Sequence, residues 1–443
     1  MGLTKEEIKK IFENFSPEPL KPNSDLYIDL FSARGVNPIK SYEIKLKLDP
    51  IGSNHFLLPG YRGCGKSTEL NGLAFRLETE EKFLIVRLNL FKDLDLYNSE
   101  YIEILLYTIE RLIKCSDDHQ IQVAKELNDL LKEWGKSTEI EKIKKIIGEV
   151  ETSTEASIGT SIAWFGEFLA KIRATVMASA SYKKTVKEII EHKLADLIDL
   201  ANRIITNIKL SMANSETNGL LFIMEDLDKL LPEKAEDLFF KHNAILRSLK
   251  ANFIYTFPVN LLYDSRFIDV KNNFTDCIEL PMVKVKTKDG EKFEIGRELL
   301  KEVVLKRIDL KYFETEELIY DFIDLCGGVL RDLFKLVNTA FDNVVIEERE
   351  QITNADFNSA FYRLKRDYEN TIAERRVDGK VIFTAEELYA NLVDLHNSTT
   401  KKIDHNQVTL SLIQNLCILG YNETWWYDLH PVVVHILRER ELI

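Results

Sequence analysis

The chain has 443 residues, of which 45% are hydrophobic and 30% are charged. This length exceeds one ordinary core, so about two or three domains are expected, and the composition excludes a mostly disordered protein. Lys and Arg number 59 and Asp and Glu number 72, which gives a net charge of −13. Such acidity disfavours a general nucleic-acid coat, although it leaves a local basic patch open.

The ends, the apolar runs and the cysteines disfavour several further classes of protein. The first ten residues, MGLTKEEIKK, mix acids and bases and predict no secretory signal. The longest uncharged stretch, 405–422, carries many polar residues and would not span a bilayer, so no membrane contact is expected. The five cysteines are scattered without a CxxC pair, which disfavours a zinc or disulfide framework and favours a reducing, cytoplasmic location.

Apolar periodicity in the first half of the chain predicts the start of a sheet. Residues 1–50 combine a short amphipathic helix with an extended, proline-rich stretch. Apolar runs at 55–59 and 82–90 predict buried strands, and a helix beginning at Lys66 lies between them. From about 99 to 215 the pattern is helical, which predicts a long insertion before the next strand.

Three later apolar runs, at 220–224, 252–257 and 277–280, predict further strands of the same sheet. Strands that alternate with helices imply an α/β fold in which a parallel sheet is covered on both faces. The expected division is an N-terminal segment and linker over 1–50, a core over 51–290, a helical lid over 291–376 and a terminal domain over 377–443.

The decisive motif is the segment 60–67, GYRGCGKS, which matches the phosphate-loop pattern G-x-x-x-x-G-K-S/T in full. Its backbone N–H groups can surround phosphate oxygens, and the helix that begins there adds its positive end. Lys66 is expected to reach the β and γ phosphates, and the Ser67 hydroxyl to bind Mg²⁺. The predicted nucleotide-binding residues are Gly60, Arg62, Gly63, Cys64, Gly65, Lys66, Ser67 and Thr68.

A second motif, LLFIMEDLD at 220–228, is an apolar strand that ends in acids. We expect Glu225 to be the acid on the metal side, together with Ser67, and Asp226 to be the catalytic acid that orients the attacking water and also faces the metal. Asp228 is a third acid just beyond. Paired acids can also be a solvated strand end, but a complete phosphate loop upstream favours the functional interpretation.

These motifs resemble those of the AAA+ and STAND branches of P-loop ATPases, with a KAP-like or origin-recognition-like core of bacterial type. The segment 220–228 is similar to the hhhhDDLD motif of STAND and KAP-type ATPases, with Glu225 where those proteins usually have Asp. The segment 327–331, GGVLR, resembles the sensor 2 region of AAA+ lids, which implies that Arg331 meets the γ-phosphate as a catalytic residue. A helix start with an exposed arginine is the structural alternative.

Three weaker resemblances concern single positions around the site. Thr256 occupies a place similar to sensor 1, where a core threonine fits equally well. Arg266 lies in a context similar to the arginine finger of AAA+ oligomers, which would act from a neighbouring subunit, although a surface arginine is the commoner role. The segment 27–35, YIDLFSARG, resembles the linker that contacts adenine in origin-recognition-type AAA+ proteins.

The last part of the chain, 383–443, has the element pattern of a winged helix, which by analogy would bind DNA. However, no Lys or Arg occurs from 403 to 437, and a recognition helix needs cations to contact phosphates. Protein contacts are therefore favoured, and a partner-facing tryptophan at 425 or 426 is expected. A basic run over 183–193 is interleaved with glutamates, which favours a solvated helix face over phosphate contact.

The sequence thus predicts a switch that binds ATP and Mg²⁺ and hydrolyses ATP slowly. Its nucleotide state would control self-association or the binding of a protein partner. Two alternatives stay open: a DNA-associated AAA+ ATPase of the initiator or loader type, and an ATPase that regulates a separate effector in a bacterial conflict system.

Overall fold

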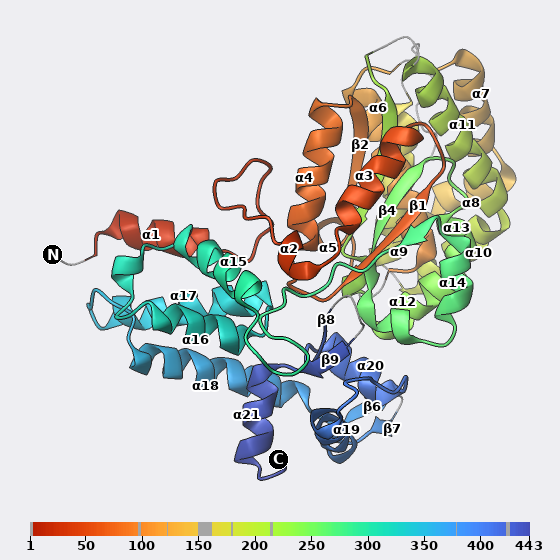
Figure 1. Cartoon of the computed structure of the whole chain (residues 1–443). Coiled ribbons are helices and arrows are strands. Elements are labelled where there is room, and N and C mark those ends of the chain that lie inside the picture. Colours follow the sequence, from red (N-terminus) through yellow and green to blue (C-terminus); the bar gives the residue numbers. More distant parts are fainter. Residues whose placement is uncertain are drawn as a thin grey trace.

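The computed structural model describes residues 3–95, 99–121, 123–148, 162–178, 180–212, 216–377, 379–421 and 426–443. A parallel sheet with its helical insertion forms one half of the molecule, and a helical lid and the C-terminal domain form the other (Figure 1). The chain has an α/β P-loop fold with a helical insertion, a helical lid and a C-terminal winged-helix arrangement, as the sequence predicts.

The sheet has five parallel strands in the order β2-β3-β4-β1-β5. Because β4 separates β1 from β3, the phosphate loop after β1 and the acids after β3 reach the same edge of the sheet with one strand between them. The strands are β1 (His55–Gly60), β2 (Phe83–Asn89), β3 (Gly219–Glu225), β4 (Asn252–Pro258) and β5 (Asp276–Cys277).

The fifth strand is shorter than the predicted run 277–280. Regular pairing of β5 with β1 covers only Asp276 and Cys277, and Leu280 then returns to β1 through a single bridge to Gly60. The next residue, Pro281, lacks a backbone N–H and could not have donated to a continued ladder. The prediction of a four-residue strand over 277–280 was therefore wrong in extent.

Side chains of each central strand alternate between two cores, one on each face of the sheet. Phe56 and Leu58 of β1 pack with one cluster, which includes Leu70 of α4 (Lys66–Thr79). Leu57 packs with the other cluster, which includes Leu106 of α6 (Tyr101–Asp118). The helices around the sheet are α3 (Pro38–Leu48), α4 (Lys66–Thr79), α5 (Leu90–Asp93), α12 (Pro232–Glu236), α13 (Asn243–Leu246) and α14 (Phe267–Asn273).

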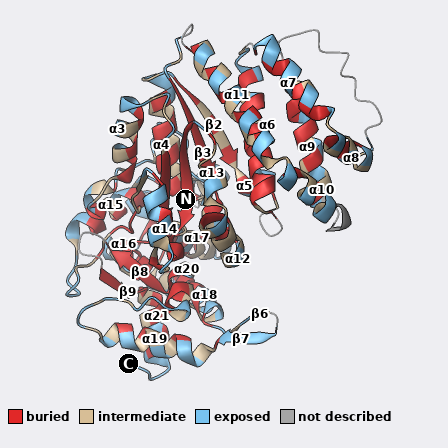
Figure 2. Ribbon diagram, turned by 90° about the vertical axis from the view of Figure 1, so that its right-hand side faces the viewer, coloured by how far each residue is buried: buried red, intermediate tan, exposed pale blue. Residues whose placement is uncertain are grey.

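The stretch 99–215 is a helical insertion in its described parts. Its residues fill the second core, to the right of β2 and β3 in Figure 2. Lys183, Lys187 and Lys193 of the basic run all lie within ion-pairing distance of acids of the insertion, so the run forms internal pairs. The helices are α6 (Tyr101–Asp118), α7 (Lys125–Gly135), α8 (Thr138–Ile146), α9 (Ala163–Ala178), α10 (Ala180–His192) and α11 (Leu194–Met212).

The N-terminal residues join the lid to the sheet. Helix α1 (Lys5–Asn14) packs on the lid, where the rings of Phe12 and Phe341 lie 5.4 Å apart. Helix α2 (Phe31–Arg34) leads into α3, which packs on α4. The lid helices are α15 (Glu294–Leu305), α16 (Glu317–Cys326), α17 (Leu330–Ile346) and α18 (Asn354–Thr371).

The C-terminal domain has the two helices, hairpin and final helix that the sequence predicts. Its hairpin contacts the lid, because the Tyr421 hydroxyl donates to the Gly327 carbonyl at 2.8 Å. Trp426 is buried, and Trp425, the other candidate for a partner contact, lies outside the described residues. The elements are β6 (Arg375–Val377), β7 (Lys380–Phe383), α19 (Ala385–Asn397), α20 (Gln407–Gln414), β8 (Ile418–Tyr421), β9 (Trp426–Leu429) and α21 (Pro431–Glu439).

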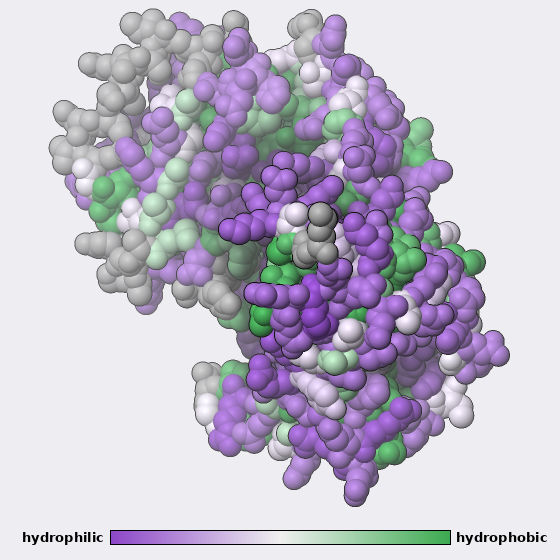
Figure 3. All heavy atoms as spheres, turned by 90° about the vertical axis from the view of Figure 1, so that its left-hand side faces the viewer, coloured by the Kyte–Doolittle hydropathy of each residue, from purple (hydrophilic) through white to green (hydrophobic). Residues whose placement is uncertain are grey.

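Hydrophilic side chains dominate the face on the left of Figure 1, with scattered apolar residues between them (Figure 3).

Among the helices of the described residues, none has the length and apolar character that crossing a membrane requires. Short helical turns complete the chain: η1 (Leu227–Lys229), η2 (Asp237–Lys241), η3 (Val259–Tyr263) and η4 (Leu310–Tyr312).

Candidate nucleotide site

The phosphate loop connects β1 to α4 and depends on glycine at two positions. Gly63 and Gly65 have φ of +79° and +101°, a region that other residues adopt only with strain. A Cβ at Gly63 would also lie 2.6 Å from the Cβ of Arg331. The motif glycines therefore let the loop curl at the start of α4 while a lid residue lies against it.

Lys66 is buried in this structure and holds the loop together. Its Nζ donates to the carbonyls of Gly60 at 2.7 Å and Tyr61 at 3.0 Å, and lies 3.0 Å from Oδ2 of Asp228. Burial by itself would lower the pKa of Lys66, but the Asp228 carboxylate outweighs burial and raises it. Lys66 is thus a charged ammonium whose partner is the third acid, Asp228.

Glu225 ends β3 beside the first helical turn of α4. Its carboxylate accepts from Arg87 at 3.0 Å and from the Ser67 hydroxyl. Burial raises the pKa of Glu225 above its usual value, while the Arg87 charge and the Ser67 hydrogen bond oppose that rise. A serine hydroxyl next to a carboxylate is a pair of hard oxygen ligands, which suits Mg²⁺.

Among the described residues, no cluster of three or more His, Cys, Asp or Glu could hold a metal ion. Mg²⁺ prefers one or two carboxylates together with waters and substrate phosphates to an all-protein cage. Ser67 and Glu225 therefore fit a magnesium ion that arrives with a nucleotide, and the bound ion would neutralise phosphate charge.

Asp226 follows Glu225 in a left-handed conformation, with φ of +73°. For a non-glycine residue this costs roughly 1–2 kcal/mol, and such strain tends to be kept at functional positions. Its Oδ1 lies 2.6 Å from the Lys229 ammonium. The buried Thr256 accepts from the N–H of Leu227 at 3.1 Å and hydrogen-bonds to Asp228, so the sensor 1 candidate fixes the segment after β3.

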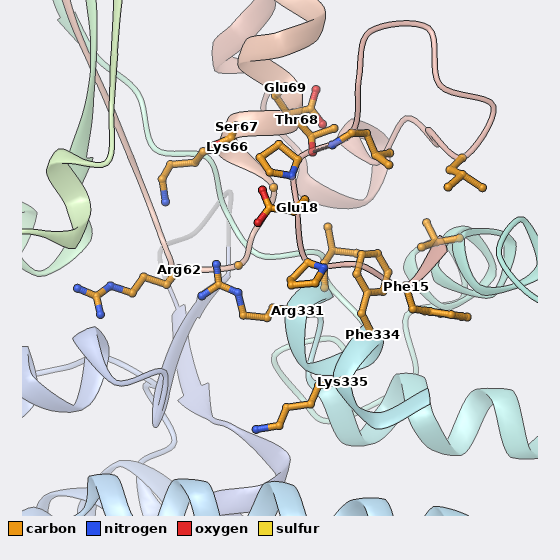
Figure 4. Close-up of a pocket in the computed structure, with 18 of the residues that line it drawn as sticks. Phe15, Glu18, Arg62, Lys66, Ser67, Thr68, Glu69, Arg331, Phe334 and Lys335 are labelled. Atoms are coloured by element: carbon orange, nitrogen blue, oxygen red, sulfur yellow. Dashed lines mark hydrogen bonds between the residues drawn. The ribbon is translucent and has the colours of Figure 1, made fainter. Parts of the chain in front are cut away.

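A cavity of about 600 Å³ opens from the phosphate loop. Arg62, Lys66 and Arg331 lie at one end of it, and Phe15 and Phe334 lie at the other (Figure 4). The walls come from the phosphate loop, from lid helix α17 and from the N-terminal stretch 15–30, in which the N–H of Leu20 donates to the Thr68 hydroxyl at 3.1 Å. A long, amphipathic cavity with cations at one end matches a nucleoside triphosphate in shape and charge.

The structure brings most of the predicted site residues to this cavity. Arg62, Gly63, Gly65, Lys66, Ser67, Thr68, Asp226 and Arg331 line it. Gly60 and Cys64 support the loop from behind, and Glu225 lies behind Ser67. Arg266 does not reach the cavity: its guanidinium pairs with Asp264 at 2.6 Å and Glu236 at 2.8 Å.

Sequence reasoning missed several residues that shape the site. Arg34 is buried behind the loop and donates to the carbonyl of Cys64 at 2.6 Å and to that of Pro281. The sequence shows Asp228 only as a third acid after the strand and does not predict its pairing with Lys66. The resemblance of 27–35 to an adenine-contacting linker pointed to this region, and Tyr27, Ile28 and Leu30 do line the cavity.

No family model matches the chain, and no curated protein matches it. Among solved structures, the chain is similar to the ORC2 protein of Aeropyrum pernix in ADPNP–ADP complexes, with 12% identity over 97% of this chain and 98% of that chain and a TM-score of 0.42. Cdc6p from Pyrobaculum aerophilum gives 12% identity, 97% and 98% coverage and a TM-score of 0.39. The A. pernix ORC1 protein in complex with DNA is 12% identical over 94% of this chain and 96% of that chain, with a TM-score of 0.36.

Proposed function

We propose that this protein is an AAA+/STAND-type ATPase that acts as a nucleotide-dependent switch. ATP and Mg²⁺ bind at residues 60–68, Asp226 orients the attacking water, and Arg331 meets the γ-phosphate. The single observation that carries this proposal is the cavity itself, in which the complete phosphate loop, the acid after β3 and a lid arginine face one space.

The lid is packed so that events at the phosphate loop can reach the C-terminal domain. The turn at 327–328, just before α17, contacts that domain through the Tyr421 hydroxyl and through Pro431, which packs against Gly327. Asp332, the residue after Arg331, lies 3.3 Å from Nε2 of His430 and accepts from Tyr368 at 2.6 Å. A shift of Arg331 toward a γ-phosphate would therefore displace contacts of the terminal domain.

Slow hydrolysis suits such a switch, because a long-lived ATP state keeps one set of surfaces exposed. Lys66→Ala should abolish nucleotide binding or turnover, measured by phosphate release and isothermal titration calorimetry. Unchanged turnover in this variant would refute the site assignment. Turnover at tens per second without a partner, above the median for enzymes of about 10 per second, would refute the switch.

The output of the switch is testable by mass. We expect the particle mass to increase with a non-hydrolysable ATP analogue in the wild type, and not in Lys66→Ala. A monomer in both states would contradict nucleotide-controlled self-association, and a protein partner would then be the remaining output.

DNA association is the alternative function, and the charges near the terminal domain bear on it. Two lysines beside the hairpin, Lys286 and Lys401, both pair with Asp428, so one of their two positive charges is neutralised within the chain. A titration of duplex DNA against salt separates the two functions. Phosphate contacts would give a steep decrease of affinity with salt, and the switch proposal expects no such binding.

A further inference from the structure

The apolar end of the cavity is formed by parts of the chain that are far apart in sequence. Helix α17 runs along the cavity, with Arg331 against the phosphate loop and Asn338 seven positions further on the same face. At about 1.5 Å of rise per residue, the two side chains are separated by about 10 Å along the helix. Arg331 and Asn338 therefore face two different parts of the cavity.

Flat apolar surfaces line this end. The rings of Phe15 and Phe334 lie 5.8 Å apart, and the guanidinium of Arg307 lies over the Phe334 ring at 4.6 Å. Arg307 is held in place, because it donates to the carbonyls of Leu26 at 3.1 Å and Val303 at 2.9 Å. A planar heterocycle fits such a wall through stacking and apolar contact.

Two buried polar atoms in this wall lack a hydrogen-bond partner among the described residues, Nε of Arg307 and Oδ1 of Asn338, and only the second is an acceptor. Oδ1 of Asn338 is buried and accepts no hydrogen bond from any described residue, although the residue lines the cavity. An unsatisfied buried carbonyl oxygen costs roughly 1–3 kcal/mol, so a ligand that brings a donor to this place removes a penalty as well as adding a bond. The wall therefore provides an acceptor at the position of a base.

We infer that Asn338 selects adenine over guanine by accepting a hydrogen bond from the exocyclic 6-amino group. Adenine presents a donor at this position, whereas guanine presents the O6 acceptor, which would face the Asn338 oxygen with no proton between them. The inference rests on the proposed ATP binding and adds to it the residue that reads the base. A rotation of the Asn338 amide by 180° would place its NH₂ group opposite the 6-position of the base, and this donor would favour the O6 acceptor of guanine.

The test compares ATP with purine riboside triphosphate, which lacks only the 6-amino group, and with GTP. Dissociation constants are measured by calorimetry for the wild type, Asn338→Leu and Asn338→Ala. Asn343→Leu is the matched control, because Asn343 lies on the same helix and does not line the cavity. We expect the wild type and the control to prefer ATP to the 6-H analogue by about tenfold.

In both Asn338 variants that preference should decrease to about one, because ATP binding weakens and binding of the 6-H analogue does not. Three outcomes would each overturn the inference. The wild type could bind ATP and the analogue equally well, the Asn338 variants could leave the ratio of the two affinities unchanged, or the wild type could prefer GTP. Those outcomes leave the phosphate site intact. A wild type that binds none of the three nucleotides would instead refute the proposed function.

Discussion

The two ends of the cavity are built in opposite ways. The phosphate end comes from one continuous stretch, 60–68, together with the acids that follow β3. It consists of backbone groups and charges, such as the pair of Lys66 and Asp228, whose Nζ and Oδ2 lie 3.0 Å apart. The proposed base end comes from 15–30, α15 and α17, and it combines apolar side chains such as Phe15 and Phe334 with Arg307 and with Asn338, whose Oδ1 lacks a partner among the described residues.

This contrast follows from the ligand chemistry. Phosphates are the same in every nucleotide, so their site can be a fixed loop geometry that a short motif encodes. A base is recognised by stacking and one or two polar contacts, which side chains from any element can supply. The phosphate end should therefore control chemistry and stability, and the base end should control the choice of nucleotide.

The largest effect is expected from Asp226→Asn, which removes the carboxylate proposed to orient the attacking water. Turnover should decrease by about 10²–10³-fold, because a positioned general base contributes rate of that order. ATP affinity and the preference for ATP over the 6-H analogue should stay close to wild type. Phosphate release and calorimetry measure the two quantities.

The control for Asp226→Asn is Asp289→Asn, because Asp289 is exposed and lies in a loop. Glu225→Gln in parallel resolves how the two acids divide their roles. Normal turnover in Asp226→Asn together with an inactive Glu225→Gln would show that Glu225 activates the water, which reverses the proposed assignment.

Asp228→Asn should reduce the stability of the nucleotide-free protein. The buried Lys66 ammonium would lose the carboxylate that pairs with it, and an uncompensated buried charge costs roughly 3 kcal/mol. Nucleotide phosphates would supply the missing negative charge, so a saturating ATP analogue should raise the melting temperature more in this variant than in the wild type. Scanning fluorimetry measures both shifts, and equal shifts would show that Asp228 does not hold Lys66 in place of phosphate.

Arg331→Ala tests the lid, since α17 serves both ends of the cavity. We expect ATP affinity to decrease by about 10–100-fold, the value of a hydrogen bond to a charged group, and ADP affinity to change little because ADP has no γ-phosphate. The preference for ATP over the 6-H analogue should be unaffected. Arg363→Ala on the exposed side of the lid is the control, and an equal loss for ATP and ADP would place Arg331 at another phosphate.

The same contrast decides what could be predicted from sequence. The phosphate loop, the acids after β3 and the alternation of strands with helices are local patterns, and the structure has each of them where it was predicted. The roles of Arg34, Arg307 and Asn338 could not be predicted, because each depends on contacts across the fold, such as that between Arg307 and Leu26. Periodicity shows which helix face is buried, and it does not show which distant segment covers it.

The phosphate loop also has a rear face, which contacts neither end of the cavity. The Tyr61 side chain lies against the terminal hairpin, where a Cβ on Gly420 would lie 2.8 Å from its hydroxyl. Next to it, Glu279 lines a second cavity with Tyr263 and Tyr427, and Tyr263 donates to it at 3.5 Å. Burial raises the pKa of Glu279 from its usual 4.5 to about 8.

The effect expected at this rear face is a pH-dependent one. The folded chain binds the Glu279 proton more tightly than the unfolded chain, so unfolding releases a proton between pH 4.5 and 8, and stability decreases as pH rises through this interval. Glu279→Gln removes this dependence. The melting temperature of this variant should match that of the wild type near pH 4.5 and exceed it increasingly up to pH 8, and the difference should stay constant above pH 8. Glu291→Gln is the control, because it removes an exposed carboxylate. A lead that is constant from pH 4.5 to 9 would show that Glu279 titrates alike in both states. The interface between the phosphate loop and the terminal hairpin would then be hydrated enough to hold the charged carboxylate of Glu279.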